Sequence, residues 1–194
     1  MWCCPARFVC RHEPFAPGQG AIARLNPCLG WGECSTPLVP LVITLRAVEP
    51  ADLPVLFEHQ LDPEAARLAA FPSRQRDAFM AHWTKLLANP ANAARTIVCD
   101  GRVAGNIGAW TDADTGERRV GYWIGREFWG RGIASAALAQ FLECEPVRPL
   151  TARVAKHNPG SFRVLQKNGF VAVGEDRSAG PDGQAVGEFV LRLA

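Results

Sequence analysis

From residue 43 to the C-terminus, hydrophobic positions recur with the periods of strands and helices. Residues 43–48 alternate between apolar and polar as a half-buried strand does, and Pro50 suits the first turn of a helix. The apolar residues expected on one face of that helix are Leu53, Leu56, Phe57 and Leu61. A second helix is predicted to begin near Ser73, which can cap it. Its apolar stripe, at i, i+4, i+7 and i+8, is Phe79, Trp83, Leu86 and Leu87.

The second half of the chain continues this pattern with shorter elements. Asp100-Gly101 is a strong hairpin signal between two predicted strands, 96–99 and 103–110. A turn at 114–116 precedes a strand over 118–124, and a helix over 132–143 follows the strand. The remaining predicted elements are a strand over 150–155, a helix over 159–168, a strand over 170–173, a turn at 180–183 and a last strand over 186–193.

The order of these elements is β-α-α-β-β-β-α-β-α-β-β. Antiparallel strands that feed a β-α-β unit predict an α/β (mixed α+β) fold, with a mostly antiparallel sheet of about seven strands and helices on both faces. Residues 1–40 differ, because they hold six of the fifteen prolines, four glycines and five of the seven cysteines, without periodicity. We therefore expect an irregular, poorly ordered extension over 1–40 and one domain over 41–194.

Composition and charge narrow the possible functions. The 194 residues, 48% of them hydrophobic, suit one well-packed domain, and a net charge of +2 without a Lys/Arg run favours neither a nucleic-acid nor a membrane partner. With no apolar stretch of transmembrane length and no secretory signal, we expect a cytoplasmic protein with reduced cysteines. The lack of a C-x-x-C pair argues against a zinc site built from Cys3, Cys4, Cys10 and His12, so no metal is expected.

The strand-loop-helix over 120–135 carries the most informative chemistry. Gly130 and Gly132 allow a tight turn and leave no Cβ in the way of a ligand. The amides of residues 131–135 then become the unpaired donors of a helix N-terminus, and Arg131 adds a full positive charge beside them. Such a pocket suits a pyrophosphate. A P-loop run is absent, and the loop lies too late in the chain for a dinucleotide-binding first strand.

Three stretches together carry a resemblance to a known family. They are Gly121-Tyr-Trp-Ile-Gly-Arg-Glu-Phe-Trp-Gly-Arg-Gly-Ile-Ala134, Asn158-Pro-Gly-Ser161 and Lys167-Asn-Gly-Phe170. Over about Ile43 to Leu193, the chain resembles the GNAT N-acetyltransferases, especially the branch of ribosomal-protein alanine acetyltransferases. The family loop reads Q/R-x-x-G-x-G/A, where Trp129 takes the first position and Gly132 and Ala134 match.

The resemblance implies a GNAT-like sheet and acetyl-CoA as co-substrate. It further implies that the strand before the loop separates from the next strand, so that pantetheine enters between them. The cofactor-binding residues implied in this way are Trp123, Ile124, Arg126, Trp129, Gly130, Arg131, Gly132, Ile133, Ala134, Ser135, Asn158 and Ser161. Asn158, followed by proline, is equally suited to cap a helix, and both roles are expected together.

Acetyl transfer by direct attack in a ternary complex needs a neutral amine and a proton for the departing thiolate. Many relatives supply that proton from a Tyr seven residues after the Asn, where this chain has Leu165. Ser161, or water, is the replacement candidate. Relatives often carry a Glu that acts as the general base at the position that Arg119 occupies here. The candidate base is Glu117, two residues earlier on the same face; the alternatives are Glu127, Glu175, Glu188 and a water chain.

The acceptor is expected to be a small-molecule amine or a protein N-terminus, on a monomer or homodimer. In this fold the first two helices and the last hairpin frame its site. They offer an aromatic and acidic set that suits a cationic amine, namely Phe71, Trp83, Trp110, Asp112 and Asp114. The missing Tyr and the Arg at position 119 leave a second function open, a non-catalytic acyl-CoA-binding module that kept the pyrophosphate loop.

Overall fold

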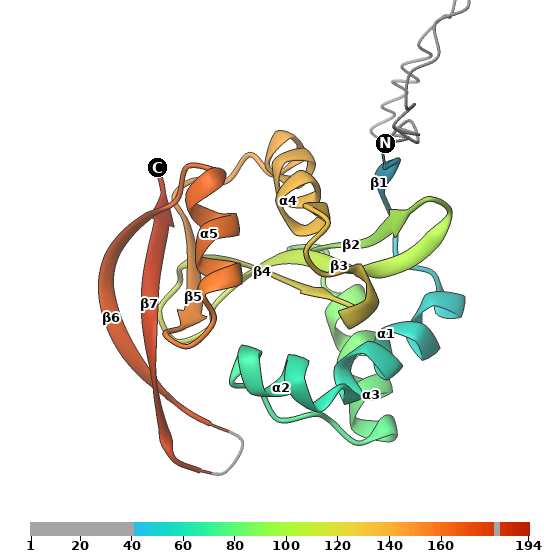
Figure 1. Ribbon diagram of the computed structural model, residues 1–194, viewed down its shortest axis with the longest axis horizontal. Helices are drawn as coiled ribbons and strands as arrows, with labels where there is room; N and C mark the ends of the chain where they lie inside the picture. The colour runs from blue at the N-terminus through green and yellow to red at the C-terminus, as the bar shows by residue number, and fades with distance from the viewer. Residues whose placement is uncertain (1–40, 181–182) are drawn as a thin grey trace, which may run out of the picture. The chain divides into compact units, whose positions relative to one another are not determined.

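The computed structural model describes residues 41–180 and 183–194 (Figure 1). Within them, seven strands form one sheet in the order β1-β2-β3-β4-β5-β7-β6. The strands are β1 (Ile43–Arg46), β2 (Ala93–Cys99), β3 (Arg102–Thr111), β4 (Arg118–Ile124), β5 (Leu150–Ala155), β6 (Val171–Ala179) and β7 (Ala185–Leu193). Only β4 and β5 pair in parallel, so the predicted mixed, mostly antiparallel sheet is confirmed.

Helices cover both faces of this sheet, with α4 and α5 on one side and α1, α2 and α3 on the other (Figure 1). Their bounds are α1 (Leu53–Leu61), α2 (Pro63–Ala69), α3 (Arg76–Ala88), α4 (Ile133–Cys144) and α5 (Pro159–Lys167), with 3-10 turns η1 (Pro50–Asp52) and η2 (Arg126–Phe128). The prediction missed α2, which is too short to show an apolar stripe. Its signal was the pair Asp62-Pro63: the Asp62 carboxylate accepts from the Ala65 amide at 2.9 Å, and Pro63 opens the helix.

The core lies in two clusters. The larger packs the sheet against the buried stripe of α4, and the smaller packs Leu53, Leu56 and Phe57 of α1 against Phe79 and Trp83 of α3. The predicted stripes are right for these residues but wrong for their last members, since Leu61 is 43% and Leu87 45% exposed. Each stands eight residues after the first residue of its stripe, which turns it about 80° round the helix.

One smaller expectation about the first half of the chain needs correction. Ser73 does not cap a helix, because α3 begins at Arg76 and the Ser73 hydroxyl donates to the Gln60 carbonyl at 2.7 Å.

The predicted extension 1–40, with the four candidate zinc ligands, lies outside the described residues, as do positions 181 and 182 of the predicted turn. No helix in the described ranges is long and apolar enough to cross a membrane.

The feature that positions the site is the separation of β4 from β5. The two strands pair only at Arg118–Leu150 and Arg119–Thr151. The rest of β4, 120–124, pairs with β3 on one side, and no strand pairing is present on its other side within the described chain. The ends of the two strands therefore part, as the family resemblance implies. One end leads to the glycine loop and α4, the other to Asn158 and α5.

Candidate functional site

The glycine loop has the backbone that its sequence requires. Gly130 and Gly132 have φ of +73° and +77°, in the left-handed region that residues with a Cβ rarely adopt. A Cβ built on either glycine would meet no protein atom within 4 Å, so the surface of the loop is open there. The loop therefore needs glycine for its conformation, and it leaves space in front of its backbone.

This open surface leads onto the N-terminus of α4. The first helical hydrogen bond runs from the Ala136 amide to the Gly132 carbonyl at 3.1 Å, so the amides of 133–135 precede it. Gly132, in the N-cap position, provides no side-chain cap. Arg131 stands beside these donors, with its guanidinium 5.8 Å from the Phe128 ring and 3.7 Å from the Asp100 carboxylate. The arrangement is a helix N-terminus with amides unpaired within the helix, flanked by a cation, which is the kind of site that can hold an anion.

The other expected cofactor residues are held by the protein itself. The Trp129 indole donates to the Ile124 carbonyl at 2.8 Å and so ties the loop to the end of β4. The Trp123 indole donates to the His59 carbonyl of α1 at 3.0 Å. The Arg126 guanidinium lies 3.6 Å from the Asp62 carboxylate. These contacts tie the loop, α1 and the segment after α1 to the end of β4, whose edge beyond Arg119 has no pairing with β5.

On the other side of the opening, Asn158 holds two helices together. Its side-chain oxygen accepts from the Ser161 amide at 3.0 Å, which is the predicted cap of α5. Its side-chain nitrogen donates to the Leu68 carbonyl of α2 at 3.1 Å. The single side chain of Asn158 therefore positions both α2 and the first turn of α5, which carries the Ser161 hydroxyl.

The Ser161 hydroxyl has a partner that the sequence alone does not reveal. Its Oγ lies 2.7 Å from the hydroxyl oxygen of Tyr122, which projects from β4. Burial raises the pKa of Tyr122 to about 12, although the hydrogen bond to Ser161 acts in the opposite direction. The phenol is therefore protonated throughout the neutral range. The position of the usual family Tyr, Leu165, is buried and apolar.

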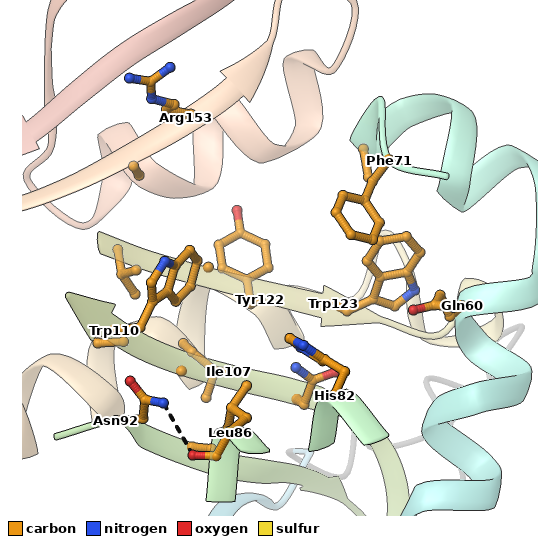
Figure 2. A pocket seen from close by; sticks show the side chains of 18 of the residues that line it. Gln60, Phe71, His82, Leu86, Asn92, Ile107, Trp110, Tyr122, Trp123 and Arg153 are labelled. Atoms are coloured by element: carbon orange, nitrogen blue, oxygen red, sulfur yellow. Dashed lines mark hydrogen bonds between the residues drawn. The ribbon is translucent and has the colours of Figure 1, made fainter. Parts of the chain in front are cut away.

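Asn158, Ser161 and Tyr122 open into a cavity of about 730 Å³. It lies between helices α1–α3 and the parted strands, and Figure 2 shows Tyr122, Trp123, Trp110, His82 and Phe71 around the same space. A volume of this size is typical of sites for small molecules. Phe71, Trp83 and Trp110 line it as expected, although Trp83 is mainly a core residue.

The acidic residues expected at the acceptor end are not there. Asp112 pairs with Arg119 at 2.9 Å, Asp114 is exposed in the turn between β3 and β4, and neither lines the cavity. Glu117, the expected base, is exposed just before β4 and does not line it either, so the structure does not bring Glu117 and Ser161 together. The three alternatives, Glu127, Glu175 and Glu188, are likewise outside the lining.

The cavity instead contains a histidine. His82 lies on α3 and, in Figure 2, points into the cavity below Tyr122 and Trp123. Burial, and then the charge of Arg74, lower its pKa below the usual value. A signal for it was present, since His82 falls three residues after Phe79 and therefore extends the apolar stripe of α3. A neutral imidazole in the cavity can accept a proton and so could act as a general base.

Comparisons with known proteins bear on the family and the fold of the chain. A family model described as an acetyltransferase (GNAT) domain matches residues 43–171. The curated protein "Uncharacterized N-acetyltransferase p20" of Bacillus licheniformis is 29% identical, over 66% of this chain and 78% of that protein. A spermidine N-acetyltransferase from Vibrio cholerae, solved with CoA and spermine, superposes with a TM-score of 0.69 at 16% identity, covering 78% of this chain and 94% of that one. A GNAT-family acetyltransferase from Bacillus anthracis gives 0.65 at 17% identity, over 78% and 93%.

Proposed function

The chain belongs to the GNAT family of acetyltransferases, and on that basis we propose that it moves an acetyl group from acetyl-CoA to a primary amine by direct attack in a ternary complex. One observation carries the proposal. The glycine loop and Tyr122 lie on the β4 side of a single opening between β4 and β5, Ser161 lies on its other side within hydrogen-bond distance of Tyr122, and Tyr122 and Ser161 both line the cavity.

Several features of the chain fit the CoA part of the co-substrate. The amides of 133–135 and the Arg131 charge would bind the pyrophosphate, and glycines at 130 and 132 leave room for it. Beyond Arg119, the edge of β4 that faces β5 has no strand partner among the described residues, and its free backbone groups, with Trp123 and Ile124 at the end of the strand, would bind pantetheine. The same proposal covers the remaining cofactor-binding residues, which are Arg126, Trp129, Ile133, Ala134, Ser135, Asn158 and Ser161.

Bound acetyl-CoA supplies a thioester, whose carbonyl carbon forms a bond to the amine nitrogen while its bond to the CoA sulfur breaks. Residues of the chain then take part in two proton transfers. We place the base on His82 rather than Glu117, because His82 is in the cavity and neutral, and it takes a proton from the amine nitrogen. Ser161 Oγ donates a proton to the departing sulfur and regains one from solvent, while His82 releases the amine proton to solvent, so that one proton passes in net from the nitrogen to the sulfur. Tyr122 hydrogen-bonds to Ser161 and holds that hydroxyl in place.

The test is acetyl-CoA binding by calorimetry, together with CoA release from purified protein and a panel of amines and peptides. We expect micromolar-range binding and acceleration of CoA release by at least one class of amine. Binding without turnover on any acceptor would favour the non-catalytic acyl-CoA-binding module, for which the apolar Leu165 at the usual acid position is the supporting observation. Absence of acetyl-CoA binding would contradict both.

A further inference from the structure

The charged side chains that line the cavity are of one sign. The described residues that line it include three cationic side chains, Arg74, Lys85 and Arg153, and no aspartate or glutamate. Lys85 is exposed on α3, at the edge of the lining. A site for a polycation needs carboxylates to bind its ammonium groups, and this lining has none among the residues described.

Arg74 differs from the other partly buried arginines in the described part of the chain. Arg118 pairs with Glu145 at 2.6 Å, Arg119 with Asp112 at 2.9 Å and Arg153 with Asp176 at 2.5 Å. Arg74 is also partly buried, yet no ion pair links it to any carboxylate in the described part of the chain. Burial lowers its pKa, since a guanidinium taken from water without a counter-charge is destabilised. The described part of the protein supplies no carboxylate to this guanidinium, so an anionic ligand could provide the missing counter-charge.

The position of Arg74 is fixed, and it adjoins the proposed base. Its carbonyl accepts from the Gln60 side chain at 3.4 Å, and the neighbouring Ser73 hydroxyl donates back to the Gln60 carbonyl at 2.7 Å. Its guanidinium stacks on the Phe71 ring at 4.6 Å, and Figure 2 shows Phe71 beside Trp123 at the cavity. Its charge also acts on His82. A bound molecule could therefore contact Arg74 with one group and His82 with another.

We propose that the acceptor is a small amine that also carries a carboxylate or similar anionic group, the amino-acid class, and that Arg74 binds this anion while the amine faces His82. The inference rests on the proposed acetyltransferase function and adds its substrate class. Phe71, Trp110 and Trp123 offer apolar surface to the rest of such a molecule. It replaces the earlier expectation of a cationic acceptor, which relied on Asp112 and Asp114.

Matched pairs of compounds test this, each pair an amino acid and its decarboxylated amine. L-phenylalanine is compared with phenethylamine, and L-lysine with cadaverine, by kcat/KM for acetyl-CoA-dependent thiol release. We expect the amino acid to be favoured by about 10–100-fold, the range of one charge-assisted pair of hydrogen bonds. Arg74→Ala should bring that ratio close to one, whereas Arg177→Ala, an exposed arginine on β6 outside the lining, should keep it.

Equal use of the two members of every pair, or an amino-acid preference that survives in Arg74→Ala, would overturn the inference. Turnover of plain amines or spermidine without preference leaves the acetyltransferase function intact and rejects only the substrate class. If no amine turns over, the acetyltransferase proposal fails separately. The anion site is then judged by calorimetry in the presence of CoA, where N-acetyl-L-phenylalanine should bind more tightly than N-acetylphenethylamine, and only with Arg74 present.

Discussion

Tyr122 and Ser161, 39 residues apart in the chain, bring their hydroxyl oxygens within 2.7 Å of each other where β4 and β5 part. Each residue alone has an ordinary explanation, as a strand aromatic and as a first-turn polar residue. Their contact gives the Ser161 hydroxyl a fixed orientation at the mouth of the cavity. Because burial raises the pKa of Tyr122 to about 12, the phenol keeps its proton and remains a hydrogen-bonding partner at any pH used for assay.

The first prediction concerns this pair. Tyr122→Phe removes one hydroxyl and leaves the ring in place, so kcat should fall about tenfold, the value of one hydrogen bond of about 1–1.5 kcal/mol. KM for acetyl-CoA should change little, because Tyr122 acts through Ser161. Steady-state kinetics of Tyr122→Phe, Ser161→Ala and the double variant measure the coupling. Losses that simply multiply in the double variant would mean that the two hydroxyls act independently.

A second prediction follows from His82. Its lowered pKa keeps the ring neutral at pH 7, so a role as base predicts that kcat falls only as the pH drops below that lowered pKa. Arg74→Gln removes the nearby positive charge, so the pKa of His82 rises and the fall in kcat moves to higher pH. Phenethylamine is the substrate to use, since it has no anion to bind Arg74.

The control for this prediction is His82→Gln, which has no titrating ring. It should lower kcat by about 100-fold near pH 7 and abolish the fall that His82 causes in the wild type. An unchanged pH profile in both variants would assign the base to another group or to water. Glu117→Gln, at the exposed position before β4, should leave the profile as it is.

The third prediction separates the two roles of Asn158. Asn158→Asp keeps an oxygen to accept from the Ser161 amide, so the cap of α5 survives, but it loses the donor to the Leu68 carbonyl. Asn158→Ala loses both, and its free energy of unfolding should fall by about 1–2 kcal/mol, the usual loss for an N-cap. Denaturant unfolding should therefore rank the aspartate variant closer to wild type. The activity of both should fall, because each frees α2 from α5 beside the cavity.

The elements that the sequence predicted well are those whose signal is local. The bounds of β4 and β5 agree with the prediction because turn-forming residues flank both strands, and Gly132 was identified because its backbone conformation excludes most other residues. The acid, the base and the acceptor charge depend on which segments face each other. The helical period places His82 on the same face of α3 as the apolar stripe. It does not show that His82 lines the cavity and is not packed in the core. Likewise, Asp112 is acidic in the sequence and neutralised by Arg119 in the fold.

The last prediction tests the loop against a matched backbone. Gly132 and Gly116 both have positive φ, +77° and +69°, and a Cβ on either would meet no protein atom within 4 Å. Substitution by Glu therefore imposes similar strain at both, about 1–2 kcal/mol of unfolding free energy. Only at Gly132 would the new carboxylate lie where the helix amides are proposed to bind pyrophosphate. We expect Gly132→Glu to abolish acetyl-CoA binding in calorimetry and Gly116→Glu, in the turn before β4, to retain it. If both variants bind acetyl-CoA alike, the pyrophosphate does not lie on this loop.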